Sequence, residues 1–408
     1  MLNRFDVIII GAGAAGLAAA GFIKNRSVCV LERNEKSGKK LYITGKGRCN
    51  VTNDCLPADF LGSVVTNPKF LYSSVYGFTP ADTKELLRAH GVETKTERGN
   101  RVFPVSDKAS DVIKALYAHA QSSGTRFVFN ERVKSVKHDD GKFTVTAQNE
   151  QYVCDKLLIA SGGKSYPATG STGDGYAFAK SLGHNIVSTR PSLVDMNTEQ
   201  NVSSLAGLTL KNVCVKIEAD GAKYSQFGEM LFTHSGVSGP TILRLSAYVN
   251  RYSPPLKLYI DLKPALDENT LDKRVTEDFA ANANKQLKNS LDALLPKAII
   301  DTVLAQSGLQ TDKKVNIITV RERAQLVHTL KNLRFDITAL GSFENAVVTA
   351  GGVDVKEIHP KTMESKLVKN LYFAGEVIDA DALTGGYNIQ IALSTGYAAA
   401  KAINEGER

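Results

Sequence analysis

Residues 6–32, DVIIIGAGAAGLAAAGFIKNRSVCVLE, carry the most specific pattern in the chain. The apolar run Val7 to Ile10 predicts a buried strand, and three glycines after it take the special positions of a dinucleotide-binding turn. We expect Gly11 to permit the tight turn, Gly13 to let a pyrophosphate approach the backbone, and Gly16 to let the next helix pack on the strand.

The rest of this segment extends the same unit. A helix is expected from about Ala14, so that backbone N–H groups of Ala14 and Ala15 face the phosphates. A second strand, residues 27–31, ends in Glu32, which lies 21 residues after Gly11 and suits hydrogen bonds to ribose hydroxyls. Arg33 is expected at the same site. A glycine-rich turn without a ligand is the alternative, but it leaves the order strand, turn, helix, strand and acid unexplained.

Composition limits the class of protein. A chain of 408 residues with 43% hydrophobic residues is expected to form two or three globular domains. The first residues lack the pattern of a secretion signal, and no apolar run is long enough to span a membrane, so we expect a cytoplasmic protein with no membrane partner. Five cysteines without a CxxC pattern predict neither a disulfide framework nor a metal site.

The charge balance leaves two interpretations. Fifty basic residues against 42 acidic ones give a net charge of +8. This excess fits an anionic partner such as RNA, or a phosphate-bearing cofactor and a basic solvated surface. The same choice applies to a cluster near residue 330, which is either a solvated face or a polyanion contact: Arg321, Arg323, Lys331 and Arg334. The oligomeric state is left open.

The C-terminal region favours FAD over NAD. Residues 371–374 form another apolar strand that ends in Gly375-Glu376, and a helix begins close to Gly386. FAD enzymes related to glutathione reductase are similar at this point, with the acid on the ribityl chain and the helix N-terminus at the flavin. A helix N-terminus stabilises the negative charge of a reduced flavin. The helix start is expected to contribute Gly386, Tyr387, Asn388 and Ile389.

Further segments are expected at the same cofactor. Residues 127–136 alternate as a strand pair would, and the backbone near Val133 is expected to pair with adenine. Residues 157–160 predict a strand that returns to the nucleotide, followed by small residues where the backbone passes close to a ligand. The expected contacts here are Ala160, Gly162, Gly163 and, in a second turn, Gly352.

Four motifs give the chain a family resemblance. They are GKKLYITGKGRCNVTN at 38–53, GEMLFTHSGVSGP at 228–240, VTAGGV at 348–353 and AGEVIDADALTGGYN at 374–388. Together they resemble the BaiN/RdsA (YhiN-type) flavoprotein family over essentially the whole chain. The resemblance implies an α/β fold: a Rossmann-type, glutathione-reductase-like FAD domain split by an inserted β-barrel-like domain and a small helical subdomain.

Periodicity supports this layout. Val213, Val215 and Ile217 alternate as in an antiparallel strand, and leucines between 287 and 295 recur at helical spacing. We expect the first part of the FAD domain at residues 1–190 and an inserted β domain at 191–262. A helical subdomain follows at 263–330, the β domain returns at 331–345, and the second part of the FAD domain occupies 346–408.

Two residues are candidates for catalysis. Cys49 lies in GKGRCN, where it could form a redox disulfide with Cys55, act as a general acid beside the flavin, or pack in a loop that lines FAD. His234 could donate a proton or orient a substrate carbonyl, or its ring could satisfy local backbone groups. The loop around Cys49 is also expected to hold the cofactor through Lys40, Gly47, Arg48 and Asn50.

These features predict an FAD oxidoreductase. The chain has one GxGxxG unit, so we expect resident FAD and NAD(P)H as a transient electron donor. The family resemblance implies reduction of an activated C=C bond, in a uridine of large-subunit ribosomal RNA or, as the alternative, in a steroid-like enone. An FAD-binding redox sensor or RNA-binding protein without turnover remains open, and an amine oxidase is weaker. No HExxH, nucleophile elbow or P-loop is present.

Overall fold

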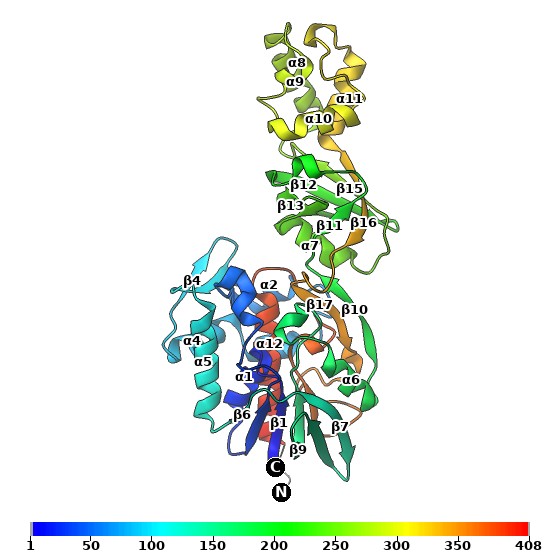
Figure 1. The fold of residues 1–408 in the computed structure, drawn as a ribbon. Helices are drawn as coiled ribbons and strands as arrows, with labels where there is room; N and C mark the ends of the chain where they lie inside the picture. Colours follow the sequence, from blue (N-terminus) through cyan, green and yellow to red (C-terminus); the bar gives the residue numbers. More distant parts are fainter. Residues whose placement is uncertain (1–2, 407–408) are drawn as a thin grey trace. The chain divides into compact units, whose positions relative to one another are not determined.

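The computed structural model describes residues 3–406, which divide into two compact units. The first, called the Rossmann unit, comprises residues 1–192 and 342–408, and the second, called the inserted unit, comprises residues 193–341. In Figure 1 the chain leaves the Rossmann unit in green, passes through the inserted unit and returns in orange and red.

A twisted sheet organises the Rossmann unit. Its strands run in the order β6 (Arg126–Val128), β2 (Val28–Leu31), β1 (Asn3–Ile10), β9 (Gln151–Ile159), β8 (Lys142–Ala147) and β7 (Val133–Asp139), and β18 (Leu371–Phe373) pairs with β9. β1 is parallel to both β2 and β9. Val7 to Ile10 are buried because layers cover the sheet on both faces, which explains their continuous apolar run.

The expectation of a strand pair at residues 127–136 is wrong. β6 and β7 lie at opposite ends of the sheet order, where β6 pairs with β2 and β7 pairs with β8. The residues between them form no hairpin turn, because their backbone bonds to another segment: Asn130 N–H donates to Asn34 and Glu131 N–H donates to Glu32. Period-2 alternation reveals strands, but it does not reveal their partners.

Small residues let helices α1 (Ala14–Phe22) and α12 (Tyr387–Glu405) pack closely against each other. α5 (Ala109–Ser122) also packs against α1. A Cβ atom at Gly396 would lie 2.5 Å from the carbonyl oxygen of Ala15, so glycine is needed at this helix contact. The other α-helices of the unit are α2 (Pro57–Leu61), α3 (Tyr72–Gly77), α4 (Pro80–Ala89) and α6 (Asp174–Ser181). A small sheet has the strand order β3 (Thr52–Asn53), β5 (Arg101–Pro104) and β4 (Thr94–Glu97), and β10 (Ile186–Ser192) pairs with β17 (Val348–Val353).

A closed six-stranded barrel forms the base of the inserted unit. Its strands follow the order β11 (Met196–Thr198), β14 (Gly236–Ser238), β13 (Ala222–Phe232), β12 (Thr209–Ala219), β15 (Leu256–Asp261) and β16 (Leu333–Leu340), and α7 (Pro240–Val249) packs against β13. Val215, Ile217, Leu258 and Ile260 are fully buried, so their neighbours along β12 and β15 face outward. The predicted barrel-like insertion is confirmed.

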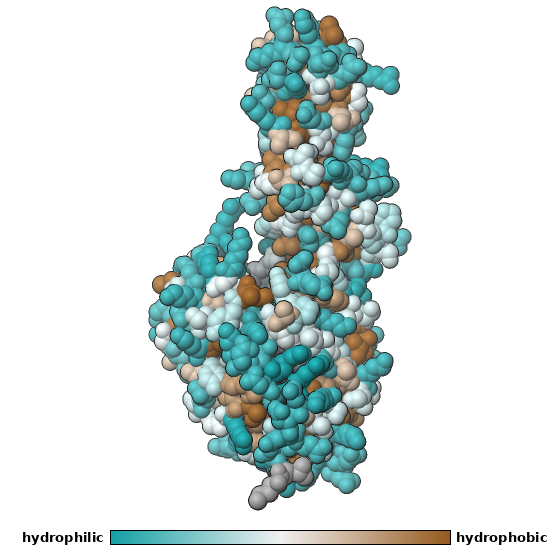
Figure 2. Space-filling model, viewed as in Figure 1, coloured by the Kyte–Doolittle hydropathy of each residue, from teal (hydrophilic) through white to brown (hydrophobic). Residues whose placement is uncertain are grey.

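Four helices are inserted between β15 and β16: α8 (Glu268–Ala281), α9 (Leu287–Ser290), α10 (Lys297–Gln306) and α11 (Val320–Lys331). Their buried leucines join the hydrophobic core of the barrel, and hydrophilic residues cover most of their surface on the face shown in Figure 2. Across residues 3–406, no helix is long and apolar enough to cross a membrane.

Candidate functional site

The glycine turn has the geometry that the sequence predicts. A Cβ atom at Gly11 would lie 2.6 Å from the Ala160 carbonyl oxygen, and one at Gly16 would lie 1.9 Å from the Gly11 carbonyl oxygen. At Gly13, by contrast, a Cβ atom would meet nothing within 4 Å. Gly13 is the N-cap residue of α1, so this open space lies beside the helix N-terminus. An anionic group fits such a position.

Glu32 lies directly beside this turn. Its carboxylate accepts hydrogen bonds from Ala12 N–H and from the backbone N–H and side-chain amide of Asn34, each at 2.8 Å. The side chain is 7% exposed. Each carboxylate oxygen can accept more than one hydrogen bond, so capacity for a ribose hydroxyl is left. Its predicted ribose contact stays a prediction.

The structure brings two other predicted residues to Glu32. Glu131 N–H donates to the Glu32 carbonyl, which places the segment between β6 and Val133 beside the residue that follows β2. Arg33 Nη1 donates to Thr172 Oγ1 at 2.6 Å and lies 3.5 Å from an Asp174 oxygen. Segments near residues 33, 131 and 172 are thus tied together, on the side of the turn where an adenosine is expected.

A partly buried ion pair joins Lys40 and Glu376. Lys40 Nζ lies 2.6 Å from Glu376 Oε2 and also donates to Ser165 Oγ. The other carboxylate oxygen accepts from Ser165 Oγ at 2.8 Å and from Thr349 N–H at 3.0 Å. Burial by itself would raise the pKa of Glu376, but the Lys40 ammonium and these donors hold the pKa below its ordinary value of 4.5.

The small residues after β9 pack against this pair. Ala160 N–H donates to the Ile10 carbonyl, which continues the parallel pairing beside the glycine turn. A Cβ atom at Gly163 would lie 2.4 Å from Thr349 Oγ1 and 2.6 Å from Glu376 Oε1. Gly162 and Gly352 have φ values of +75° and +147°, which favour glycine. These glycines are therefore required by the packing of the protein itself.

The N-terminus of α12 contacts the loop that carries Cys49. A Cβ atom at Gly386 would lie 2.3 Å from the Thr52 carbonyl oxygen, and Thr52 Oγ1 donates to Gln390 at 2.6 Å. Asn388 bonds the backbone of Ala382 in both directions, so its amide shapes the loop before the helix. The helix start also contains Tyr387 and Ile389. Gly375, which follows β18, lies close to α1, because a Cβ atom there would lie 2.9 Å from the Ala15 Cβ atom.

Within the same loop, Arg48 and Asn50 have different surroundings. Arg48 forms ion pairs with Glu97 and Asp107, and its guanidinium lies 4.1 Å from the centre of the Phe103 ring. Its predicted contact with cofactor oxygens is not tested by this arrangement. Among the described residues nothing hydrogen-bonds the buried Oδ1 atom of Asn50. A buried acceptor without a donor is costly, so this oxygen suits a bound group that donates to it.

Cys49 is completely buried, with a positive φ of +60°. Burial raises the pKa of its thiol to about 11, although a hydrogen bond with Thr44 lowers it in part. Cys55 is also a free thiol, and burial raises its pKa to about 11. A protonated thiol can donate a proton and is a poor nucleophile. The general-acid role of Cys49 remains a prediction.

This environment predicts low thiol reactivity at Cys49. In folded protein at pH 8 we expect iodoacetamide to modify Cys49 at least ~100-fold more slowly than in urea-unfolded protein. The pKa of the thiol rises from its ordinary value of 9.0 to about 11, which lowers the thiolate fraction by about that factor, and no surface of the side chain is exposed. Peptide mass spectrometry measures each rate. Cys214, which is partly exposed, is the internal comparison. Equal rates at both cysteines would contradict the burial of Cys49.

His234 lies in the inserted unit, whereas Cys49 lies in the Rossmann unit. The histidine is exposed on the turn between β13 and β14, where Thr233 N–H donates to the Gly236 carbonyl. Its predicted proton-transfer role stays untested. Most of the basic cluster is engaged within the unit: Arg323 pairs with Asp272, Lys331 with Asp261 and Arg334 with Asp336.

Sequence reasoning missed the partners of the predicted residues. Asn34, Ser165 and Gln390 complete the hydrogen bonding described above, yet none belongs to the glycine or acid pattern. Asn34 could have been predicted, because it is the second residue after Glu32 in the sequence. The others come from distant segments, and no local signal identifies them. No group of three or more potential metal ligands occurs within residues 3–406.

Taken together, the turn, the buried acid after β2 and the small residues after β9 define a Rossmann-type dinucleotide-binding fold. The residues fit FAD on two observations: open space at Gly13 beside a helix N-terminus, and an unsatisfied acceptor at Asn50 in the loop that contacts α12.

The family model described as HI0933-like protein Rossmann domain matches residues 5–402, so the chain belongs to this family. The chain is 33% identical to "Ribosomal RNA dihydrouridine synthase" of Escherichia coli, over 98% of each chain. It is 29% identical to "3-dehydro-bile acid delta(4,6)-reductase" of Clostridium scindens, covering 99% of this chain and 100% of that one. The family expected from the four motifs is confirmed.

Solved structures support the fold. A 3-ketosteroid-Δ4-(5α)-dehydrogenase from Rhodococcus jostii superposes with a TM-score of 0.54 at 16% identity, covering 100% of this chain and 97% of that one. A flavocytochrome c3 fumarate reductase gives 0.52 at 15% identity, covering 99% and 78%. The predicted fold class, a Rossmann-type FAD-binding fold with an inserted barrel, is confirmed.

Proposed function

We propose that this chain is an FAD-dependent oxidoreductase that reduces a uridine of large-subunit ribosomal RNA to dihydrouridine, with NAD(P)H as the electron donor. The observation that carries the proposal is the similarity of the whole chain to the ribosomal RNA dihydrouridine synthase, 33% over 98% of both chains. FAD, when bound, supplies hydride transfer between the donor and an activated C=C bond.

The chain's own residues would bind and orient the cofactor. The N-terminus of α1 offers backbone N–H groups to the pyrophosphate, while Glu32 and the segment before Val133 suit the adenosine. Glu376 lies next to α1 through Gly375, so we assign it, with Lys40, to the ribityl region. The N-terminus of α12 would stabilise negative charge at the flavin pyrimidine edge.

A proton must also reach the carbon α to the substrate carbonyl. Cys49 is protonated at neutral pH and lies in the loop that contacts α12 through Thr52, which keeps it a candidate donor. His234 is the second candidate. Because Cys49 is fully buried, a role in proton transfer requires that loop to move when substrate binds.

A second candidate function is reduction of a small conjugated enone. It is favoured by the 29% identity to the bile acid reductase, which extends over 99% of this chain. Both reactions place hydride on the carbon β to a carbonyl and a proton on the α carbon. The same cofactor site would serve either substrate.

An anaerobic half-reaction separates these functions. The protein is reduced with NADH or NADPH, mixed with unmodified large-subunit ribosomal RNA or with a steroid enone, and followed by flavin absorbance near ~450 nm. Reoxidation by the RNA, with one new dihydrouridine found by mass spectrometry, supports the first proposal. Reoxidation by the enone alone favours the second. If neither substrate reoxidises the flavin, a binding or sensing role replaces both.

A further inference from the structure

The outer face of the barrel has a defined pattern of side chains. Strand register places Lys216 of β12 beside Ser225 of β13 on one side and beside Tyr259 of β15 on the other. Arg334 of β16 follows next to Tyr259. The Tyr259 ring thus stands between Lys216 and Arg334 across three neighbouring strands, and the Arg334 guanidinium is paired with Asp336.

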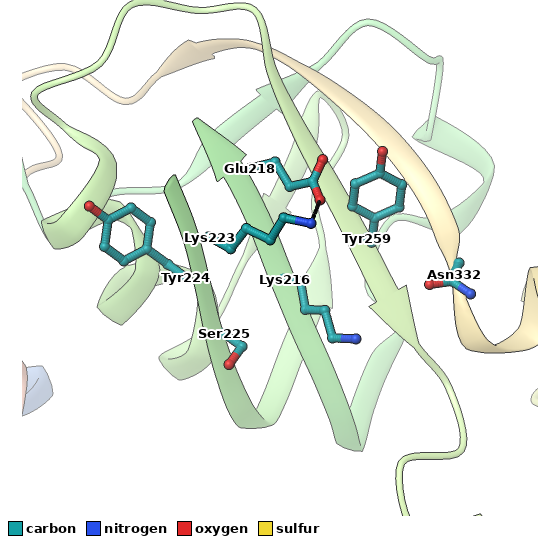
Figure 3. A pocket seen from close by; sticks show the side chains of 7 residues that line it. All are labelled: Lys216, Glu218, Lys223, Tyr224, Ser225, Tyr259 and Asn332. Carbon is teal, nitrogen blue, oxygen red and sulfur yellow. Dashed lines mark ion pairs between the residues drawn. The ribbon is translucent and has the colours of Figure 1, made fainter. Parts of the chain in front are cut away.

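A groove of about 390 Å³ opens on this face. Figure 3 shows its lining, which consists of Lys216, Glu218, Lys223, Tyr224, Ser225, Tyr259 and Asn332. The volume lies within the range of roughly 300–1,000 Å³ that small ligands occupy. All seven lining side chains end in a polar group, so the groove suits a polar ligand rather than a lipid.

The charges in the groove favour an anion. Lys223 forms an ion pair with Glu218 at 3.0 Å, and Figure 3 shows that Lys216 takes no part in this pair. Two ammonium groups against one carboxylate leave the lining with a net positive charge. Lys216 is exposed, so its ammonium is available to a phosphate without first breaking the ion pair.

Tyr259 and Asn332 supply the other chemistry that a nucleotide requires. The partly exposed ring of Tyr259 offers a face for base stacking, which tolerates any base. The Asn332 side chain lies at the end of the groove (Figure 3); its amide nitrogen donates one hydrogen bond to the His328 carbonyl at 3.2 Å, which leaves its oxygen and its second N–H for a base edge. A cation for the phosphate, a ring for the base and an amide for its edge occur together.

We propose that this outer face of β12, β15 and β16 binds a single-stranded segment of the RNA substrate, with Lys216 on a phosphate and Tyr259 stacked on a base. The inference rests on the proposed RNA function and adds a contact surface to it. Single-stranded RNA is bound by other β-barrels through the same combination of aromatic rings and cations on an outer sheet face.

Four variants test the groove. Lys216→Glu reverses the unpaired charge, and Lys297→Glu is its control on an exposed lysine of α10 in the same unit. Tyr259→Leu removes the ring, whereas Tyr259→Phe keeps it. Binding of unmodified, transcribed large-subunit ribosomal RNA is measured at several salt concentrations. We expect ~10-fold or greater loss for Lys216→Glu and Tyr259→Leu, and a salt slope reduced by about 1 or more for Lys216→Glu.

The controls should bind within ~2-fold of wild type, and all four variants should keep wild-type flavin content. If Lys216→Glu and Tyr259→Leu bind like wild type while wild type forms dihydrouridine, the inference is wrong and the proposed function stands. If wild type neither binds nor modifies the RNA, the RNA function itself fails, and the inference with it. Displacement of the RNA by polyglutamate as effectively as by polyuridylate would also overturn the inference.

Discussion

Gly16→Ala is expected to destabilise the Rossmann unit by about 3 kcal/mol and to abolish FAD binding. The added methyl group would lie 1.9 Å from the Gly11 carbonyl oxygen and 3.4 Å from a side-chain carbon of Ile9. Overpacking against side chains costs about 1–3 kcal/mol, and backbone relaxes less readily than a flexible side chain. α1 would have to move away from β1 and lose the phosphate geometry.

Gly13→Ala is the matched variant. Its φ is −82° and the methyl group would meet nothing within 4 Å, so the fold should be unaffected. FAD affinity should still fall by ~10-fold or more because the methyl group occupies the space expected for the pyrophosphate. Urea unfolding and the ratio of flavin to protein absorbance measure both variants. Full FAD content in Gly13→Ala would place the pyrophosphate elsewhere.

The glycine turn could be predicted because its constraints are local. Gly16 meets the Gly11 carbonyl and Ile9 within one strand–turn–helix unit, and the positive φ of Gly11 is a property of the turn itself, so spacing in one short segment carries the information. The buried run of β1 and the start of α12 are likewise local features. The barrel was recognisable from the alternation in β12, but β11 and β14 contain three residues each and are too short to show a period.

Long-range pairing explains what the sequence could not show. Arg48 was predicted from its motif to bond cofactor oxygens, yet its ion-pair partners Glu97 and Asp107 come from a small sheet region that no pattern marked. The strand pair expected at residues 127–136 was wrong, because partner choice depends on segments far away in sequence. Glu376 could be recognised as an acid after a strand, but its cation lies 336 residues earlier.

Lys40→Met should produce the other large effect. Removal of the ammonium leaves the Glu376 carboxylate with Ser165 and Thr349 as donors but with no paired charge. Breaking a buried ion pair costs about 3–5 kcal/mol, and the lower end applies because the two side chains are 23% and 18% exposed. We therefore expect a loss of about 3 kcal/mol at pH 7, with a parallel loss of FAD, measured by flavin release during thermal unfolding.

The pH dependence identifies the cause. In wild type the pKa of Glu376 is lowered, so its contribution to stability is complete above its ordinary value of 4.5 and is lost as the pH falls through the folded value. In Lys40→Met, burial raises the pKa of the Glu376 carboxyl, which then takes up a proton as the pH falls toward ~5. The loss of unfolding free energy relative to wild type should therefore shrink over this range. The double variant Lys40→Met, Glu376→Gln should recover part of the loss at pH 7, since no unpaired charge remains. If the double variant is as unstable as the sum of the single variants, the two side chains are not coupled and the ion pair does not hold this region together.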